Sequence, residues 1–279
     1  MDLLERYRPI KDIAVVVEKL GVLQSALRFS ARRRLTRLRP GLTVVVASWN
    51  SDEFLPTALQ GIRQFADRPV QVLVVDNHSD ISPRDICDRF AARLIRLPVN
   101  LRHSVALDIG FLLSSTEYVM SLDADAFPFS EKWLSTFLDP LEAGHDVVGC
   151  ECARGYAHPC CLAMRNETFT SGRHTFRPTY PLDAHGKAGY DVGELLSRRI
   201  NLDRVAIVPK TNSVHGADWF VGATFGDVVY HNAYSSRHLH LERPDSDGLE
   251  PSDDFVMTRP FALSTWEEAI RRWGPATWH

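Results

Sequence analysis

The sequence lacks any long uninterrupted hydrophobic stretch. Among its 279 residues, no apolar run approaches the roughly 18–20 residues of a helix that spans a bilayer. The N-terminus also lacks the pattern of a secretory signal, because charged residues interrupt it and no small-residue cleavage site follows an apolar core. We therefore expect a cytoplasmic protein that is soluble or held peripherally at the inner membrane face.

Compositional bias and an excess of one charge are also missing. Hydrophobic residues make up 44% and charged residues 24%, which excludes wholesale disorder, collagen and coiled coil. The net charge is −3, so we expect no nucleic-acid partner. The charges are unevenly spread, however: residues 1–40 hold ten Lys/Arg and four Asp/Glu, whereas the remainder holds 22 and 31. This predicts a basic N-terminal arm, residues 1–40, on an acidic body, residues 41–279.

Cysteine is too scarce and too oddly spaced for a disulfide framework. The chain has five cysteines, an odd number, and is long enough to build its own core. Cys150-x-Cys152 and Cys160-Cys161 do not match the C-x(2–4)-C spacing of zinc knuckles. Buried structural thiols are therefore the favoured interpretation.

The arm has helical spacing and ends at the breaker pair Pro40-Gly41. Its arginine run, residues 28–39, has three interpretations: a solvated helix face, which we favour slightly, a contact with anionic lipid, or an oligomer contact.

Beyond the arm, short apolar runs alternate with segments of helical spacing. This alternation indicates βαβ units, and hence an α/β fold with a mostly parallel sheet flanked by helices. The expected strands are 42–47, 70–75, 93–97 and 118–122, and the expected helices are 52–65, 83–92, 102–113 and 129–141.

The pattern weakens after residue 146. Residues 152–190 are rich in Gly, Pro, His and Arg and predict loops and short strands. We expect a short helix at 191–200, strands at 205–208 and 228–230, and a mobile loop at 243–254. A capping box at 264–267 predicts the start of a final helix that stops at Gly274-Pro275.

Polar residues follow three of the predicted strands. Ser48-Trp49-Asn50-Ser51 follows the first, Asp76 to Asp80 the second, and Asp123-Ala124-Asp125 the strand at 118–122. Ligands of open α/β sheets bind at the carboxyl ends of the strands, so we expect these residues to share one site. The sequence has no G-x-G-x-x-G after the first strand and no P-loop, which argues against a dinucleotide or P-loop site.

Asp123 and Asp125 lie two residues apart just past a strand, so their side chains share a face in extended backbone. Two hard carboxylates facing one way suit Mg²⁺ or Mn²⁺, which also accept phosphate oxygens as ligands. The alternative is a loop with two solvated acids.

Four of these segments together resemble those of a known family. TVVVASWNS, VLVVDNHSD, the stretch Asn100–Gly110 and YVMSLDAD resemble family 2 glycosyltransferases of the GT-A type, with rhamnosyltransferase-like members closest, over roughly residues 42–240. The resemblance implies one GT-A domain over residues 41–279, with a donor half at 41–150 and an acceptor half at 151–279. It implies a metal-dependent, inverting transfer of a hexosyl or deoxyhexosyl group from a nucleotide-diphosphate sugar to a hydroxyl of a glycan, a lipid-linked or a small-molecule acceptor.

The resemblance also implies roles for individual residues. Asp76 accepts a hydrogen bond from the nucleobase, Asp123 contacts the ribose or the metal, and Asp125 and His231 coordinate the metal. The remaining donor contacts are Ser48, Trp49 and Asn50 in the nucleoside pocket, Asn77 beside Asp76, and Asn100, Arg102 and Asp108 near base and phosphates. At Arg102 and Asp108 the sequence departs from the Gly and Asn common in the family.

The base that deprotonates the acceptor hydroxyl stays open between two residues. The stretch Gly189 to Glu194 resembles the family's base motif, with Asp191 the better candidate and Glu194 the other, because the usual acidic pair is reduced. The base must differ from the metal-binding carboxylates, since an acid committed to the ion is a poor base. Structural alternatives are a first-turn acid for Asp191, a core histidine for His231 and a turn cap for Asp76. His158-Pro159 either faces the acceptor or packs a loop.

Three other functions compete with glycosyl transfer. A sugar-1-phosphate nucleotidyltransferase would need a Gly- and Lys/Arg-rich loop after the first strand, which residues 48–51 do not supply. A non-catalytic nucleotide- or glycan-binding protein on a decayed transferase fold would explain the reduced base motif. A glycoside hydrolase is the weakest alternative, since its paired carboxylates predict neither a metal pair nor a nucleotide pocket. The oligomeric state stays open, with a homo-oligomer as one option.

Overall fold

The computed structural model describes residues 38–178, 190–213, 222–232 and 259–276. Most of the predicted basic arm and the predicted loop at 243–254 lie outside the described residues, so the domain boundary at residue 40 stays a prediction.

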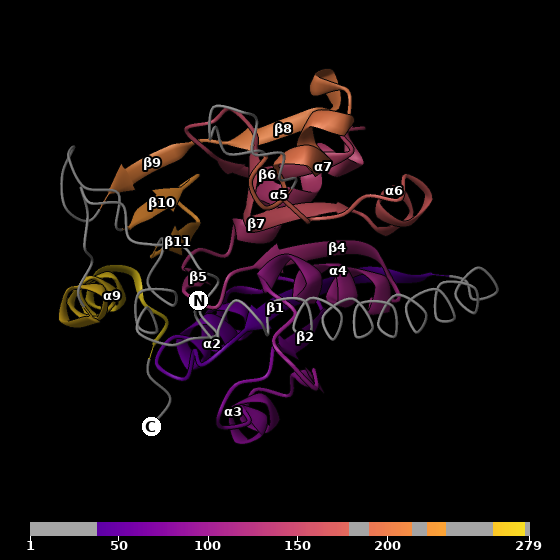
Figure 1. The fold of residues 1–279 in the computed structure, drawn as a ribbon. Coiled ribbons are helices and arrows are strands. Elements are labelled where there is room, and N and C mark those ends of the chain that lie inside the picture. The colour runs from indigo at the N-terminus through magenta and orange to yellow at the C-terminus, as the bar shows by residue number, and fades with distance from the viewer. Residues whose placement is uncertain (1–37, 179–189, 214–221, 233–258, 277–279) are drawn as a thin grey trace, which may run out of the picture. The chain divides into compact units, whose positions relative to one another are not determined.

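A seven-stranded sheet forms the centre of the described chain, in the order β3-β2-β1-β4-β7-β6-β8 (Figure 1). Strands β1, β2 and β3 are parallel to one another, as are β6 and β8, whereas β7 runs antiparallel to both of its neighbours. The predicted α/β class with a mostly parallel sheet is confirmed. The strands are β1 Arg39–Ser48, β2 Val70–Asp76, β3 Arg93–Arg96, β4 Thr116–Leu122, β6 Val147–Glu151, β7 Ala157–Arg165 and β8 Val205–Val208.

Helices connect these strands where the apolar spacing predicts them, except for the helix at 166–171, which lies in a segment expected to hold loops and short strands. The apolar faces of the helices at 55–65, 84–89 and 133–142 join one buried core with β-branched residues of β1 and β2. The predicted helix at 129–141 is shorter at its start, because 126–128 form a strand and the helix begins only at Trp133. The helices are α2 Leu55–Phe65, α3 Arg84–Arg89, α4 His103–Leu113, α5 Trp133–Glu142, α6 Asn166–Ser171 and α7 Glu194–Arg199, with a 3₁₀ turn at Leu202–Arg204.

The main correction to the sequence prediction is β7. The segment expected to hold only loops and short strands contains this nine-residue strand in the middle of the sheet. Its buried residues, Cys160 to Met164, are not β-branched, so pairing with β4 and β6 rather than local propensity makes the strand. The register shifts after Gly149, and Pro159 falls in this irregularity, where its missing N–H costs no ladder bond.

A second sheet of four short strands runs in the order β5-β11-β10-β9. Its pairing places His231 directly opposite Ala126, the residue that follows Asp125. Strand β11 was predicted, whereas β5, β9 and β10 were not. The strands are β5 Ala126–Pro128, β9 Lys210–Ser213, β10 Ala223–Phe225 and β11 Val229–His231.

Helix α9, Arg259–Trp273, packs beside β5 and β11 (Figure 1). The ring of Trp266 lies 5.1 Å from that of Phe54 and 5.2 Å from that of Phe127, centroid to centroid. The predicted capping box at 264–267 is wrong as a helix start, because the helix is already formed at Arg259 and runs through it. The predicted end before Gly274-Pro275 is confirmed.

The cysteines are as predicted. All five are free, and all but the partly exposed Cys152 are buried. None of the helices in the described part of the chain combines the length and apolarity needed to cross a bilayer.

Candidate functional site

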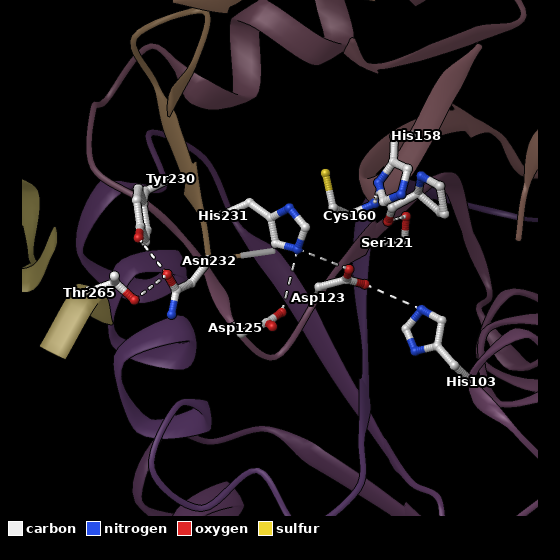
Figure 2. Close-up of polar contacts among 11 residues, drawn as sticks. His103, Ser121, Asp123, Asp125, His158, Cys160, Tyr230, His231, Asn232 and Thr265 are labelled. Carbon is white, nitrogen blue, oxygen red and sulfur yellow. Dashed lines mark hydrogen bonds and ion pairs between the residues drawn. The ribbon is translucent and has the colours of Figure 1, made fainter. Parts of the chain in front are cut away.

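Two carboxylates and one imidazole meet where β4 ends (Figure 2). His231 Nε2 lies 3.4 Å from Asp123 Oδ2 and 3.6 Å from Asp125 Oδ1. One ligand atom from each of the three residues lies within 4.8 Å of the other two. The backbone fixes this arrangement, because Asp123 N donates to the Cys160 carbonyl at 2.9 Å and Asn232 N donates to the Asp125 carbonyl at 2.8 Å.

Asp123 and His231 shift each other's pKa in opposite directions. Burial alone would raise the pKa of Asp123, but His103 and His231 hold it well below its usual range. Burial alone would lower the pKa of His231, but the Cys160 thiol and hydrogen bonds with both aspartates raise it well above its usual value.

This donor set fits a divalent cation. Carboxylate oxygens suit Mg²⁺ and Mn²⁺, and the imidazole nitrogen shifts the preference toward Mn²⁺. Within the described residues, Asp123, Asp125 and His231 form the group of acidic, histidine or cysteine side chains that could hold a metal.

His103 is a member of the site that the sequence analysis missed. It is the first residue of α4, and its Nε2 lies 3.3 Å from Asp123 Oδ1, on the other oxygen from His231. Asn100 shapes the turn before it by accepting hydrogen bonds from the Asn77 amide at 2.7 Å and from Arg102 N at 2.9 Å. Its position three residues after Asn100, within the stretch that resembles the family, was the signal that could have found it.

A pocket of about 770 Å³ opens beside this cluster. Eight of the residues proposed from the sequence line it and are therefore brought together: Ser48, Trp49, Asn77, Asn100, Asp123, Asp125, Asp191 and His231. Glu151, Cys152 and Lys210, which had no predicted role, line it as well. His158 and Pro159, which the sequence left open between facing the acceptor and packing a loop, also line it. Glu151 and Lys210 adjoin, because Lys210 N donates to Glu151 Oε2 at 2.8 Å.

Asn50 and Asp76 are not among the residues that line the pocket. Asn50 joins the ends of β1 and β2: its N–H donates to Ser79 Oγ and its Oδ1 accepts from Asp80 N, both at 2.8 Å. Asp76 is fully buried, accepts from Ser79 N at 2.9 Å and lies 3.4 Å from Arg96 Nη1. Asp76 thus caps the following turn through Oδ1, and its contact with a nucleobase stays a prediction.

Arg102 and Asp108 also lie outside the pocket lining. Arg102 is the N-terminal cap residue of α4, with φ +75°, and its N–H donates a hydrogen bond to Asn100 Oδ1. Asp108 accepts from Thr175 Oγ1 at 2.6 Å and from Phe176 N at 2.8 Å, so it fastens that segment to α4. Burial raises the pKa of Asp108 to about 6, against the effect of these bonds and of Arg177.

The two base candidates have different surroundings. Glu194 is 1% exposed, pairs with Arg154 at 2.9 Å and Arg198 at 2.8 Å, and accepts from Asp191 N at 3.0 Å. Asp191 is exposed and lines the pocket, and its carboxylate accepts from Val192 N at 2.7 Å and from Tyr156 Oη at 3.4 Å. The structure therefore brings Asp191, and not Glu194, into the pocket.

One family model and one curated relative match part of the chain. Residues 43–161 match the model of glycosyl transferase family 2. A dolichyl-phosphate hexose transferase of Haloferax volcanii is 29% identical over 108 residues, which are 38% of this chain and 46% of that protein. The chain thus matches less than half of the length of this curated relative.

Solved structures with a similar fold are more distant. Glucosyl-3-phosphoglycerate synthase from Mycobacterium tuberculosis, in complex with Mn²⁺, UDP and glucosyl-3-phosphoglycerate, is 18% identical with a TM-score of 0.47, over 66% of this chain and 73% of that one. S. aureus TarS 1–349 is 14% identical with a TM-score of 0.49, over 83% of this chain and 71% of that one.

Proposed function

We propose that this chain, a member of glycosyl transferase family 2 through residues 43–161, is a metal-dependent, inverting glycosyltransferase. It moves a sugar from a nucleotide-diphosphate donor to an acceptor hydroxyl of a glycan, a lipid-linked or a small-molecule acceptor. One observation carries the proposal: the Asp123/Asp125/His231 cluster opens into the same pocket as the exposed carboxylate of Asp191.

The metal end of the pocket would receive the donor's diphosphate. Asp123, Asp125 and His231 would hold Mg²⁺ or Mn²⁺, which when bound offsets the negative charge that develops on the departing diphosphate. Ser48 and Trp49 at the end of β1, Asn77 after β2 and Asn100 between β3 and α4 line the same pocket and would contact the nucleoside.

Asp191 would act as the base. Its exposed carboxylate can reach an acceptor hydroxyl in the pocket and take its proton as that oxygen attacks the anomeric carbon. Direct attack on the face opposite the departing diphosphate inverts the anomeric centre. Glu194 is a poor base candidate, since its carboxylate is buried between two arginines and a backbone N–H.

The test is release of nucleoside diphosphate from UDP-glucose, GDP-mannose or dTDP-glucose, with Mn²⁺ and with or without sugar and lipid-phosphate acceptors. We expect turnover of one donor, lost in Asp125→Ala and reduced about 10²–10⁴-fold in Asp191→Asn. Glu194→Gln, the matched control, keeps turnover within about tenfold.

Full activity in Asp191→Asn would overturn the base assignment. Metal-dependent donor binding without turnover in the wild type would favour the non-catalytic binding protein over an enzyme.

A further inference from the structure

We infer that His158 binds the transferred sugar, by donating a hydrogen bond from its imidazole to a hydroxyl group of the donor's hexosyl ring. The inference rests on the proposed function and deepens it, since it assigns a specificity-determining residue to the part of the pocket between the metal end and the base end.

The position of His158 follows from its two ring neighbours and from the pocket that it lines. Its ring centroid lies 5.9 Å from that of Tyr156 and 6.0 Å from that of His231. Tyr156 donates to Asp191, and His231 faces Asp123 and Asp125. His158 therefore neighbours both the tyrosine that contacts the proposed base and the histidine of the proposed metal cluster, and it lines the pocket that Asp191 and this cluster share.

The transferred sugar must lie between the proposed base and the proposed metal site. The attacking hydroxyl approaches the anomeric carbon from the base side, and the diphosphate leaves toward the metal side. The hexosyl ring must lie between the two groups, so a side chain that lines the pocket there faces the ring and its hydroxyls. His158 lines the pocket and is partly exposed, and Figure 2 shows it near His231 and Cys160.

The hydrogen bond at Nδ1 decides which ring nitrogen of His158 carries the proton. Its Nδ1 accepts from Cys160 N at 3.1 Å, so Nδ1 carries no proton and the neutral ring has its proton on Nε2. Cys160 is two residues after His158, where the pairing with β6 is irregular, and its hydrogen bond orients the imidazole ring. The ring thus offers one oriented N–H donor, which suits a hydroxyl or ring oxygen.

Two substitutions separate this role from a structural one. In His158→Asn the shorter side chain can still accept from Cys160 N, but its amide does not reach as far as Nε2. In His158→Gln an amide N–H can occupy the position of Nε2. Thermal unfolding of both variants checks that the fold is kept.

The experiment is calorimetric titration with three matched pairs in the presence of Mn²⁺: UDP and UDP-glucose, GDP and GDP-mannose, dTDP and dTDP-glucose. For the pair that the wild type binds, His158→Asn should leave the Kd of the nucleoside diphosphate within twofold and raise that of the nucleotide sugar about three- to tenfold. His158→Gln should recover part of that loss.

An unchanged Kd for the nucleotide sugar in His158→Asn would overturn the inference, and so would equal weakening of both members of the pair. Failure of the wild type to bind any of the six ligands would instead overturn the proposed function, and this inference with it.

Discussion

The Asp123 carboxylate is held from both sides, by His103 on Oδ1 and by His231 on Oδ2. A ligand carboxylate with one oxygen fixed keeps the other aimed at the ion, and loss of such an outer contact commonly weakens metal binding 10–100-fold. His103 comes from α4 and the aspartate from the end of β4, so this contact also joins two elements at the site.

We predict that His103→Ala weakens Mn²⁺ binding to the protein by about tenfold or more, because Asp123 is no longer oriented. The measurement is a Mn²⁺ titration followed by electron paramagnetic resonance. His78→Asn is the matched control, since His78 is exposed, has φ +70° and is outside the pocket lining. Equal Mn²⁺ affinity in His103→Ala and in the control would refute this role.

Asp108 makes the free energy of unfolding depend on pH. Its pKa is raised to about 6 by burial, whereas the unfolded chain has the ordinary value of 3.8. Between these values only the folded state keeps the proton, so its contribution to stability falls as pH rises from about 4 and levels off above about 6. The difference of about 2 pH units corresponds to about 3 kcal/mol.

Asp108→Asn should remove this dependence. The amide can keep the bonds to Thr175 and Phe176 without a charge to desolvate. Urea unfolding at pH 4.5 and at pH 7.5 checks it: relative to the wild type, the variant should gain stability at the higher pH. A wild-type-minus-variant difference that is the same at both pH values would contradict the argument.

At the scale of elements, the second sheet and α9 hold His231 in place. The β5–β11 pairing sets the register that puts His231 beside Asp125. Asn232, the next residue, accepts from Tyr230 Oη at 2.8 Å and from Thr265 Oγ1 of α9 at 3.0 Å. The C-terminal helix is thus connected to the candidate metal site through one asparagine and an aromatic cluster.

We predict that Trp266→Ala lowers the free energy of unfolding by about 3–5 kcal/mol, because it removes a large side chain that is 2% exposed. Trp273→Ala should cost clearly less, since Trp273 is only partly buried in the same cluster. Denaturant unfolding of both variants gives the comparison. Equal losses would mean that α9 is not anchored chiefly through Trp266.

Elements with a strong local pattern could be predicted, and those made by pairing could not. The strand at 42–47 contains the β-branched run Thr43 to Val46, and its burial between other strands follows from that composition. Residues 160–164 read Cys-Cys-Leu-Ala-Met, which has no such signal, yet they form the middle of the sheet because β4 and β6 supply the partners. The strands β5, β9 and β10 are three or four residues long and depend on each other in the same way.

For the whole molecule, the sequence could predict the α/β core and the chemistry of Asp123 and Asp125, because both depend on residues close together in the chain. The meeting of His231 with these aspartates was implied by the family resemblance and not by spacing. The contacts of His103 and His158 need the folded chain. The stretch that resembles the family marks His103 as a site candidate, but the sequence does not show which side chain either histidine meets. The choice between Asp191 and Glu194 likewise depends on which carboxylate is buried. The two residues are only three positions apart, and their spacing does not show this.

We propose that one pocket combines a divalent-cation site with a nucleotide site. The first measurement is calorimetric titration of the wild type with UDP, GDP and dTDP, each with and without Mn²⁺, with Asp125→Ala as the control. We expect micromolar binding of one nucleotide that requires Mn²⁺ and is lost in Asp125→Ala. Absence of binding to all three by a folded sample, or binding that is indifferent to Mn²⁺ and to the substitution, would contradict it.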